Sequence, residues 1–339
     1  MIVLNFYGKI PTICLSAKLG LYISNLPNDD NNDWEKDLVQ YLRLAIDADK
    51  IYQNYLERDY PLGIERLFHK LFPNKKIPKE FGKVQLQKIA EQMICMYQDY
   101  NYDDMPLGGW ETNCFDGRLC EEDYSEKIID LISFLNYRRI VNDSSTLLQP
   151  TPQWVYSSNH DEIDHYRIFW GGEAADAYIE SLKNWGLLFD NFLINRNDYL
   201  MFDYLANAIH KDNEYNENHL MKSYSICQLF LEKKWEGELD KKLPIFFEHI
   251  ESEEDKILQA KLFRQMRNKI AHGDFRAFEK VVERYAQKFL DESFSFDYSE
   301  YSRKNWTVQY VCCELDDVVR QLISLLLLDR DMLDKIRNS

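Results

Sequence analysis

Most of the chain repeats apolar residues at the three- and four-residue spacing of an α-helix, which buries one face and exposes the other. The segment from Met1 to Leu26 differs, because apolar residues there alternate with Gly8, Pro11 and Gly20, a pattern that predicts one or two short strands or a capping segment. Helices are expected over residues 33–56, 64–72, 80–97, 125–140, 173–189, 199–210, 218–233, 245–271 and 308–328. The sequence therefore predicts a mainly α protein with minor β structure.

The helical pattern recurs less regularly in the first part of the chain than in the second. Before about residue 195, turn-rich segments separate the helices, above all residues 98–122, which predict an ordered irregular loop. From Arg196 on, helical segments follow one another with polar links, as in a helical bundle. We expect a mostly helical N-terminal domain over 1–195, with a sensing or recognition role, and a helical bundle over 196–339.

Residues 263–275 of the second domain combine an apolar helix face with polar side chains on the adjacent stripe. His272 is expected where the helix stops, because Gly273 can adopt the left-handed conformation that ends helices and Asp274 favours a turn. Arg267 lies five residues earlier, and five residues of an ideal helix turn through about 140°. Arg267 and His272 therefore converge on one substrate only if the helix end distorts or a second subunit contributes.

The spacing of Arg267-Asn268, three residues, then His272 resembles the signature of the HEPN superfamily, a set of small helical domains many of which are ribonucleases. The flanking Ile-Ala-His-Gly resembles the Apea-like branch of that superfamily in particular. The resemblance covers roughly the last 145 residues and implies a HEPN-like helical bundle there. It implies that His272 acts as base or acid, that Arg267 holds a phosphate, and that Asn268 orients one or both.

The same resemblance implies partners and a biological role. HEPN nucleases usually dimerise through their motif helices, so that two histidines and two arginines line one cleft. The Apea-like branch implies bacterial anti-phage defence, in which the nuclease stays inactive until infection. The expected partners are therefore RNA, such as tRNA, and a second copy of the chain.

The chemistry of the motif residues suits RNA cleavage without a metal. Histidine has an unperturbed pKa of about 6.5, so it can take a proton from a ribose 2′-hydroxyl near neutral pH. The planar arginine fork stays charged while it pairs with phosphate oxygens. We expect cleavage of single-stranded or loop RNA, where 2′-hydroxyls are accessible, giving 2′,3′-cyclic phosphate ends or the 3′-phosphates derived from them.

The charge pattern supports an RNA site at this motif. The 339-residue chain carries a formal net charge of -16, and a uniformly acidic surface would repel nucleic acid. Between Lys261 and Lys288, however, eight basic residues outnumber three acidic ones. Phosphate contacts dominate nucleic-acid affinity, so this local reversal of sign favours a polyanion site. The residues expected to bind RNA are Lys261, Arg264, Lys269 and Arg276.

Other classes of function fit the same motif. A non-catalytic HEPN module would use this surface to bind RNA, a nucleotide or a protein partner, and an antitoxin-like scaffold would use the helix only to dimerise. Considered alone, Arg267 is an ordinary surface ion-pair residue, and His272 is an ordinary helix-terminal residue favoured by the helix dipole.

The sequence lacks the motifs of several other chemistries. It contains no Gly-rich phosphate loop, no nucleophile elbow and no His-Glu metal helix. Cys114 and Cys120, taken with His160 and His165, match no standard zinc spacing. We therefore expect neither a metal nor a cofactor.

Cysteine usage and hydropathy indicate the compartment. Seven cysteines at irregular positions fit reduced thiols better than a disulfide framework. The start of the chain lacks the basic residues of a signal peptide, and the longest late apolar run, Leu322–Leu328, is too short to span a bilayer. We expect a cytoplasmic protein that does not associate with membranes.

Overall fold

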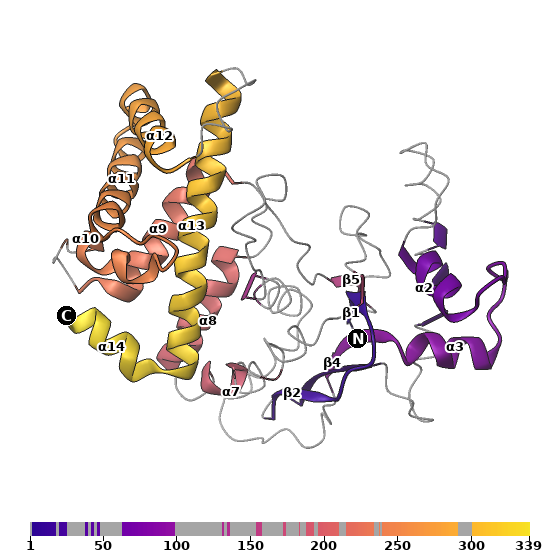
Figure 1. Ribbon diagram of the computed structural model, residues 1–339. Helices are drawn as coiled ribbons and strands as arrows, with labels where there is room; N and C mark the ends of the chain where they lie inside the picture. Colours follow the sequence, from indigo (N-terminus) through magenta and orange to yellow (C-terminus); the bar gives the residue numbers. More distant parts are fainter. Residues whose placement is uncertain are drawn as a thin grey trace. The chain divides into compact units, whose positions relative to one another are not determined.

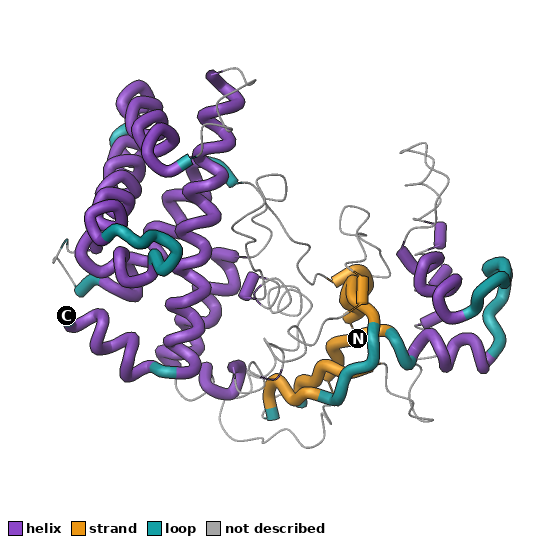
Figure 2. The backbone as a smooth tube through the Cα atoms, in the orientation of Figure 1, coloured by secondary structure: helices purple, strands orange, loops and turns teal. Residues whose placement is uncertain are grey.

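The chain folds as two compact units, Met1–His210 and Lys211–Ser339. In both units helices dominate the described residues, and the strands belong to the first unit, which confirms a mainly α protein with minor β structure (Figures 1 and 2). The boundary expected after residue 195 falls one helix before this division. The computed structural model describes residues 2–17, 20–25, 38–39, 42–43, 46–47, 63–98, 131, 134–135, 154–157, 172–173, 183, 188–192, 196–209, 215–233, 237, 239–290 and 300–339.

The first unit contains a sheet that joins distant parts of the sequence. Strand β4 pairs antiparallel with β3 on one side and with β1 on the other. The first 26 residues form three strands, β1, β2 and β3, where one or two strands or a capping segment were expected. In spatial order the sheet runs β2 (Ile13–Ser16), β3 (Leu21–Asn25), β4 (Met93–Gln98), β1 (Ile2–Tyr7) and β5 (Trp154–Ser157), and β6 (Gly172–Glu173) pairs parallel to β1.

Helices α2 (Gly63–Leu71) and α3 (Lys83–Ala90) share a hydrophobic cluster with the sheet. Within it, Met93 of β4 is fully buried beside apolar residues of both helices. Leu38 and Leu42, from a segment expected to be helical, are in helical conformation and belong to the same cluster. The unit also contains α7 (Leu188–Phe192) and α8 (Arg196–Ile209).

The single helix expected over 80–97 is wrong in its second half. Helix α3 ends at Ala90, and the chain continues as β4. Met93, Ile94 and Cys95 are all 0% exposed, so this run is buried on both faces. A short continuous apolar run fits a central strand as well as a helix, and pairing with β1 and β3 decides between them. Most of the helices expected over 33–56, 125–140 and 173–189, nearly all of the loop over 98–122 and the whole cysteine–histidine set lie outside the described residues. Where 125–140 is described it is helical, whereas 173–189 begins in β6 and ends in α7.

The second unit is a helical bundle (Figure 1). Helix α13 packs against α9 and α12, and α11 packs against the same two helices. Its elements are α9 (Glu217–Leu231), α10 (Leu239–Lys242), the 3₁₀-helix η2 (Leu243–Phe246), α11 (Glu253–Ala271), α12 (Phe275–Phe289), α13 (Glu300–Leu328) and α14 (Arg330–Asn338).

Several helix limits in this unit differ from the expected ones. The motif helix begins at Glu253 rather than at residue 245, because Pro244 lies in η2 and the Ser252 hydroxyl caps the new helix by accepting from the Asp255 N–H at 3.3 Å. Helices α12 and α14 were not expected, and α13 begins at Glu300 rather than at residue 308.

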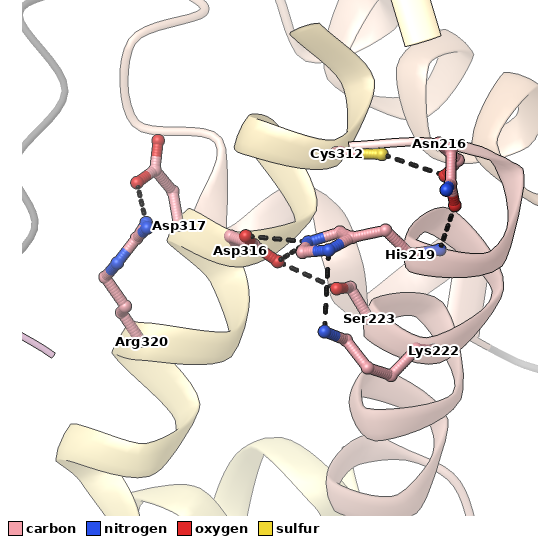
Figure 3. A network of polar contacts seen from close by, with 8 residues as sticks. All are labelled: Asn216, His219, Lys222, Ser223, Cys312, Asp316, Asp317 and Arg320. Atoms are coloured by element: carbon pink, nitrogen blue, oxygen red, sulfur yellow. Dashed lines mark hydrogen bonds and ion pairs between the residues drawn. The ribbon is translucent and has the colours of Figure 1, made fainter. Parts of the chain in front are cut away.

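A buried polar cluster joins α9 to α13 (Figure 3). His219 Nε2 lies 2.9 Å from both carboxylate oxygens of Asp316, and the Ser223 hydroxyl donates to Asp316 Oδ1 at 2.7 Å. Lys222 Nζ lies 3.5 Å from His219 Nδ1. An ammonium group cannot accept a hydrogen bond, so Nδ1 is the acceptor there and Nε2 donates its proton to Asp316. These contacts satisfy a buried carboxylate and fix how the two helices are aligned.

Lys242 is a buried lysine that closes two helix ends. Its ammonium group donates to the carbonyl oxygen of Leu231 at 3.0 Å and to that of Arg337 at 2.6 Å. Leu231 ends α9, and Arg337 lies in the last turn of α14. Carbonyl groups at helix C-termini carry partial negative charge and have no partner within their helix. Lys242 therefore supplies one cation to both ends.

The second unit has three cysteines, Cys227, Cys312 and Cys313, and all are reduced and buried. Burial, together with the negative charge of Asp316, raises the pKa of the Cys227 thiol. Among the described residues, no helix has both the length and the apolar character needed to cross a bilayer.

Candidate active site

Helix α11 carries the predicted motif, and its packing follows the apolar pattern. Phe263 and Met266 are 0% exposed, whereas Ile270, near the helix end, is half-buried. The ring of Phe263 lies 5.8 Å from that of Phe247 and 5.7 Å from that of Tyr285, measured between centroids. The core therefore holds the helix whose polar stripe carries the motif.

Helix α11 ends in a Schellman motif that sets the position of His272. The N–H of Gly273 donates to the carbonyl of Ile270 at 3.0 Å, and that of Asp274 donates to Lys269 at 2.9 Å. These two bonds define the motif. Gly273 has φ +67°, the left-handed value that this position requires. The backbone at His272 is therefore fixed, while its side chain is exposed.

Asp274 begins the next helix without an intervening loop. Its carboxylate accepts from the N–H of Ala277 at 3.3 Å, as the N-cap of α12, and from Lys269 Nζ at 3.1 Å. The bond from Lys269, followed by that from Ala277, lowers the pKa of Asp274 below its usual range. The carboxylate of Asp274 therefore links the turn that carries His272 to the end of α11 and to the start of α12.

The guanidinium of Arg267 points toward α9. Its Nη2 donates to Gln228 Oε1 at 3.4 Å, and its central carbon lies 5.9 Å from the ring centroid of Tyr224, within cation–π range. Its Nε is buried and has no hydrogen-bond partner among the described residues. Arg267 is therefore held between α9 and α11, whereas His272 lies exposed at the helix end.

Asn268 lies between the two predicted catalytic groups and contacts both residues. Its Oδ1 accepts from Arg267 Nη1 at 3.1 Å, and its carbonyl oxygen accepts from the N–H of His272 at 3.1 Å. Within the described residues, no hydrogen bond joins the guanidinium of Arg267 to the imidazole of His272. Asn268 thus links the two residues, but within the described part of one chain no hydrogen bond joins the guanidinium directly to the imidazole.

The four residues predicted to bind RNA lie on α11 and at the start of α12. Two of them are ion-paired: Arg264 with a carboxylate of α10 at 2.9 Å, and Lys269 with Asp274 at 3.1 Å. Lys261 and Arg276 are exposed, and neither forms an ion pair with another described residue. Lys261 nevertheless acts electrostatically on the carboxylate of Asp240, where it opposes the rise in pKa that burial causes, so Arg276 is the residue of the four whose charge is least engaged.

Negative charge gathers where α9, α10 and α11 meet. Burial raises the pKa of Asp240, and its ion pair with Arg264 only partly offsets this effect. Asp240 Oδ1 is buried with no hydrogen-bond partner in the described part of the chain. Burial, aided by Asp240 and Glu232, also raises the pKa of Tyr224, and the charge of Arg267 opposes this rise. Arg267 therefore lies in a region where nearby acidic residues favour its positive charge.

The cluster of His219, Asp316 and Ser223 contains the residue types of a serine hydrolase triad but not its arrangement. In a triad the imidazole lies between the serine and the carboxylate. Here Asp316 accepts from both other residues, and Ser223 is 1% exposed. We assign this cluster to helix packing.

No family model, no curated protein and no solved structure matches this chain. The HEPN resemblance therefore depends on the motif from Arg267 to His272 and on the helices that carry it. Among the described residues, no group of three or more histidines, cysteines or acidic residues is placed to hold a metal ion.

The two α9 residues that contact Arg267 were not predicted from the sequence. Tyr224 and Gln228 are four residues apart and lie on one face of α9. Gln228 is separated from Arg267 by 39 positions. A hydroxyl-bearing ring and an amide, four residues apart on a mostly apolar helix, were the local feature that could have indicated a polar partner.

Proposed function

We propose that the second unit is a metal-independent endoribonuclease of the HEPN type, acting on single-stranded or loop RNA such as tRNA. The observation that carries the proposal is the turn at His272. The exposed imidazole of His272 stands on a backbone fixed by a Schellman motif, and the arginine and asparagine of the motif lie five and four residues before it. A catalytic base needs this combination of fixed position and access to substrate.

In the proposed reaction, His272 removes the proton of a ribose 2′-hydroxyl, and that oxygen attacks the adjacent phosphorus. The bond to the 5′-oxygen of the next nucleotide breaks, which leaves a 2′,3′-cyclic phosphate and a 5′-hydroxyl. Arg267 stabilises the charge that develops on the phosphate, and Asn268 orients the motif.

The orientation of Arg267 supports a dimer as the active form. Its guanidinium is held against α9 and forms no hydrogen bond with the exposed imidazole of the same chain, within the described residues. We propose that two copies associate through their motif helices, so that both sets of groups line one cleft. Anti-phage defence in a bacterial cytoplasm is the setting that we propose for this activity.

The first test is RNA cleavage in EDTA by purified protein incubated with total tRNA. We expect Arg267→Ala and His272→Ala each to lower the cleavage rate by roughly 10²-fold or more, the usual scale for loss of an acid–base or charge-stabilising group. Arg330→Ala on α14 and His69→Ala in the first unit are the matched controls and should cleave normally. Unchanged cleavage by either motif variant would remove the site assignment.

A second test addresses the nucleophile. An RNA with a 2′-deoxy nucleotide at the cut position should bind but resist cleavage, because the attacking hydroxyl is missing. If the deoxy substrate is cut at the same phosphate, the 2′-hydroxyl mechanism is wrong.

A non-catalytic HEPN module is the second candidate, and one observation favours it. The guanidinium of Arg267 is already engaged by Gln228, Asn268 and the ring of Tyr224. Such a module would bind RNA, a nucleotide or a protein through the same surface. RNA binding without cleavage, at every protein concentration and with or without Mg²⁺, would favour this candidate over the nuclease.

A further inference from the structure

Helix α12 carries three exposed cations in a row: Arg276, Lys280 and Arg284. Residues four apart lie on the same side of a helix, and each step advances about 6 Å along the axis. None of the three forms an ion pair with another described residue. We call these three residues the α12 cation row.

The acidic residues of the same helix are engaged elsewhere. Glu283 pairs with Arg303 at 3.0 Å, and Glu279 lies 3.9 Å from Lys304. Both cations belong to α13. Both acidic side chains are still partly exposed, but the four cations of α12 outnumber them, so the helix carries a net positive charge in a chain whose net charge is -16, which favours a polyanion as its partner.

The row begins beside an exposed aromatic ring. Phe275 is 57% exposed, the residue before Arg276 and three residues after His272. The exposed ring presents a flat apolar face on which a base can stack. Surfaces that bind single-stranded nucleic acids combine cations along the backbone with aromatic rings on which bases stack.

We propose that the α12 cation row binds the phosphodiester backbone of single-stranded RNA and that Phe275 stacks one base beside His272. The proposal depends on the proposed ribonuclease function and specifies where its substrate lies. The regular spacing of the cations favours a repeating polyanion over an acidic protein, whose carboxylates have no fixed period. The exposed ring at the start of the row favours a ligand with flat bases.

The test is fluorescence anisotropy with a labelled single-stranded RNA of about 12 nucleotides, a length typical of such sites. The full chain carries His272→Ala, so that the RNA stays intact, and binding is measured in EDTA over a series of salt concentrations. The triple variant Arg276→Gln, Lys280→Gln and Arg284→Gln removes the row. For single strands each phosphate contact contributes a slope of about 0.7, so the log–log salt slope should become shallower by about 2 and affinity at 0.1 M salt should fall by about a hundredfold.

The matched control removes three exposed cations from α14 instead: Arg330→Gln, Lys335→Gln and Arg337→Gln. The change in net charge is the same, so the control should bind RNA within about threefold of the parent, with nearly the same slope. Equal losses in both triple variants would overturn the proposal, because they would reflect the overall charge rather than the row. Thermal melting of each variant shows whether the fold is kept.

Phe275 is tested in the same assay. Phe275→Ala should weaken binding by roughly 5- to 150-fold, the usual range for one stacked base, and should leave the salt slope unchanged. Phe275→Tyr should bind nearly as well as the parent. Full affinity in Phe275→Ala, or loss in both variants, overturns the stacking role.

The outcomes separate this proposal from the proposed function. If the triple variant keeps the parent's affinity and slope, the α12 cation row is wrong, while cleavage at His272 stands or falls on its own assay. If the parent binds no RNA at any salt concentration, both the row and the nuclease are overturned, and an acidic protein becomes the candidate partner.

Discussion

At the scale of single residues, Lys242 is a buried side chain whose removal should destabilise the second unit. Lys242→Met deletes the hydrogen bonds to Leu231 and Arg337 and leaves both carbonyls without this donor. Each charge-assisted bond is worth about 1.5 kcal/mol or more, so we expect a loss of about 3 kcal/mol. Urea unfolding followed by circular dichroism measures it.

The control for Lys242 is its exposed neighbour. Lys241→Met changes the same charge on the same short helix and should alter the free energy of unfolding by less than about 0.5 kcal/mol. Equal effects at the two positions would mean that the helix-end bonds contribute little.

Asp240 should make stability depend on pH. Its pKa is raised in the folded protein, chiefly by burial, so the folded state binds the proton more tightly than the unfolded chain does. The ionised carboxylate therefore lowers stability above the folded-state pKa, and protonation restores it as the pH falls through that value. We expect Asp240→Asn to melt above the parent at neutral pH, with the difference shrinking as the pH falls toward the ordinary value of 3.8.

Melting temperatures of parent and Asp240→Asn over a pH series make the comparison. A variant that melts below the parent at neutral pH would show that the ion pair with Arg264 outweighs the cost of burying the carboxylate.

Sequence reasoning placed some motif residues better than others. The end of α11 at His272 followed from Gly273 and Asp274, because the Schellman motif and the N-cap depend on adjacent residues. The direction of the Arg267 side chain could not be predicted from adjacent residues, because it depends on contact with Tyr224 of another helix, α9. Local chemistry predicts a helix end, whereas only tertiary packing decides where a long side chain points.

At the scale of elements, the turn between α11 and α12 should be sensitive to Gly273. No atom lies within 4 Å of a Cβ built there, so Gly273→Ala causes no clash and tests the backbone alone. A left-handed conformation costs a non-glycine residue about 1–2 kcal/mol, and we expect a loss of that size. Gly273→Asn should cost less, because asparagine tolerates this conformation.

Unfolding free energies of the two Gly273 variants check the order. If both variants lose the same unfolding free energy, the left-handed φ of residue 273 is not the cause of the loss. If the backbone positions His272 for catalysis, Gly273→Ala should also slow RNA cleavage, while Gly273→Asn keeps most of it.

Helix α12 and strand β4 show why the predicted helices differ from the observed ones. Helix α12 was not predicted although Phe278, Val282 and Tyr285 recur at helical spacing and are buried, so its signal was present and overlooked. Strand β4 was predicted as helix because its apolar residues are consecutive, so they show neither the alternation of a half-buried strand nor the spacing of an amphipathic helix. Pairing with β1 and β3 fixes it as a strand, and this depends on residues about 70 to 90 positions away.

At the scale of the whole molecule, the division after residue 210 predicts how fragments behave. A fragment of residues 211–339 contains the complete bundle from α9 to α14, so we expect it to fold alone with a cooperative transition. A fragment of residues 196–339 adds α8, which belongs to the first unit, and should gain no stability from it.

Circular dichroism and thermal melting of both fragments check this prediction. A clear rise in melting temperature with residues 196–209 present would instead place the domain boundary where the sequence suggested it, after residue 195.

The burial of all three thiols in the second unit makes the bundle convenient for site-specific labelling. Thiolates are the reactive species, and burial both shields Cys227 and raises its pKa, so maleimide reagents should spare it. In a 211–339 fragment, Lys280→Cys would then be the single accessible attachment point. A dye or spin probe fixed there would report directly on whatever approaches α12.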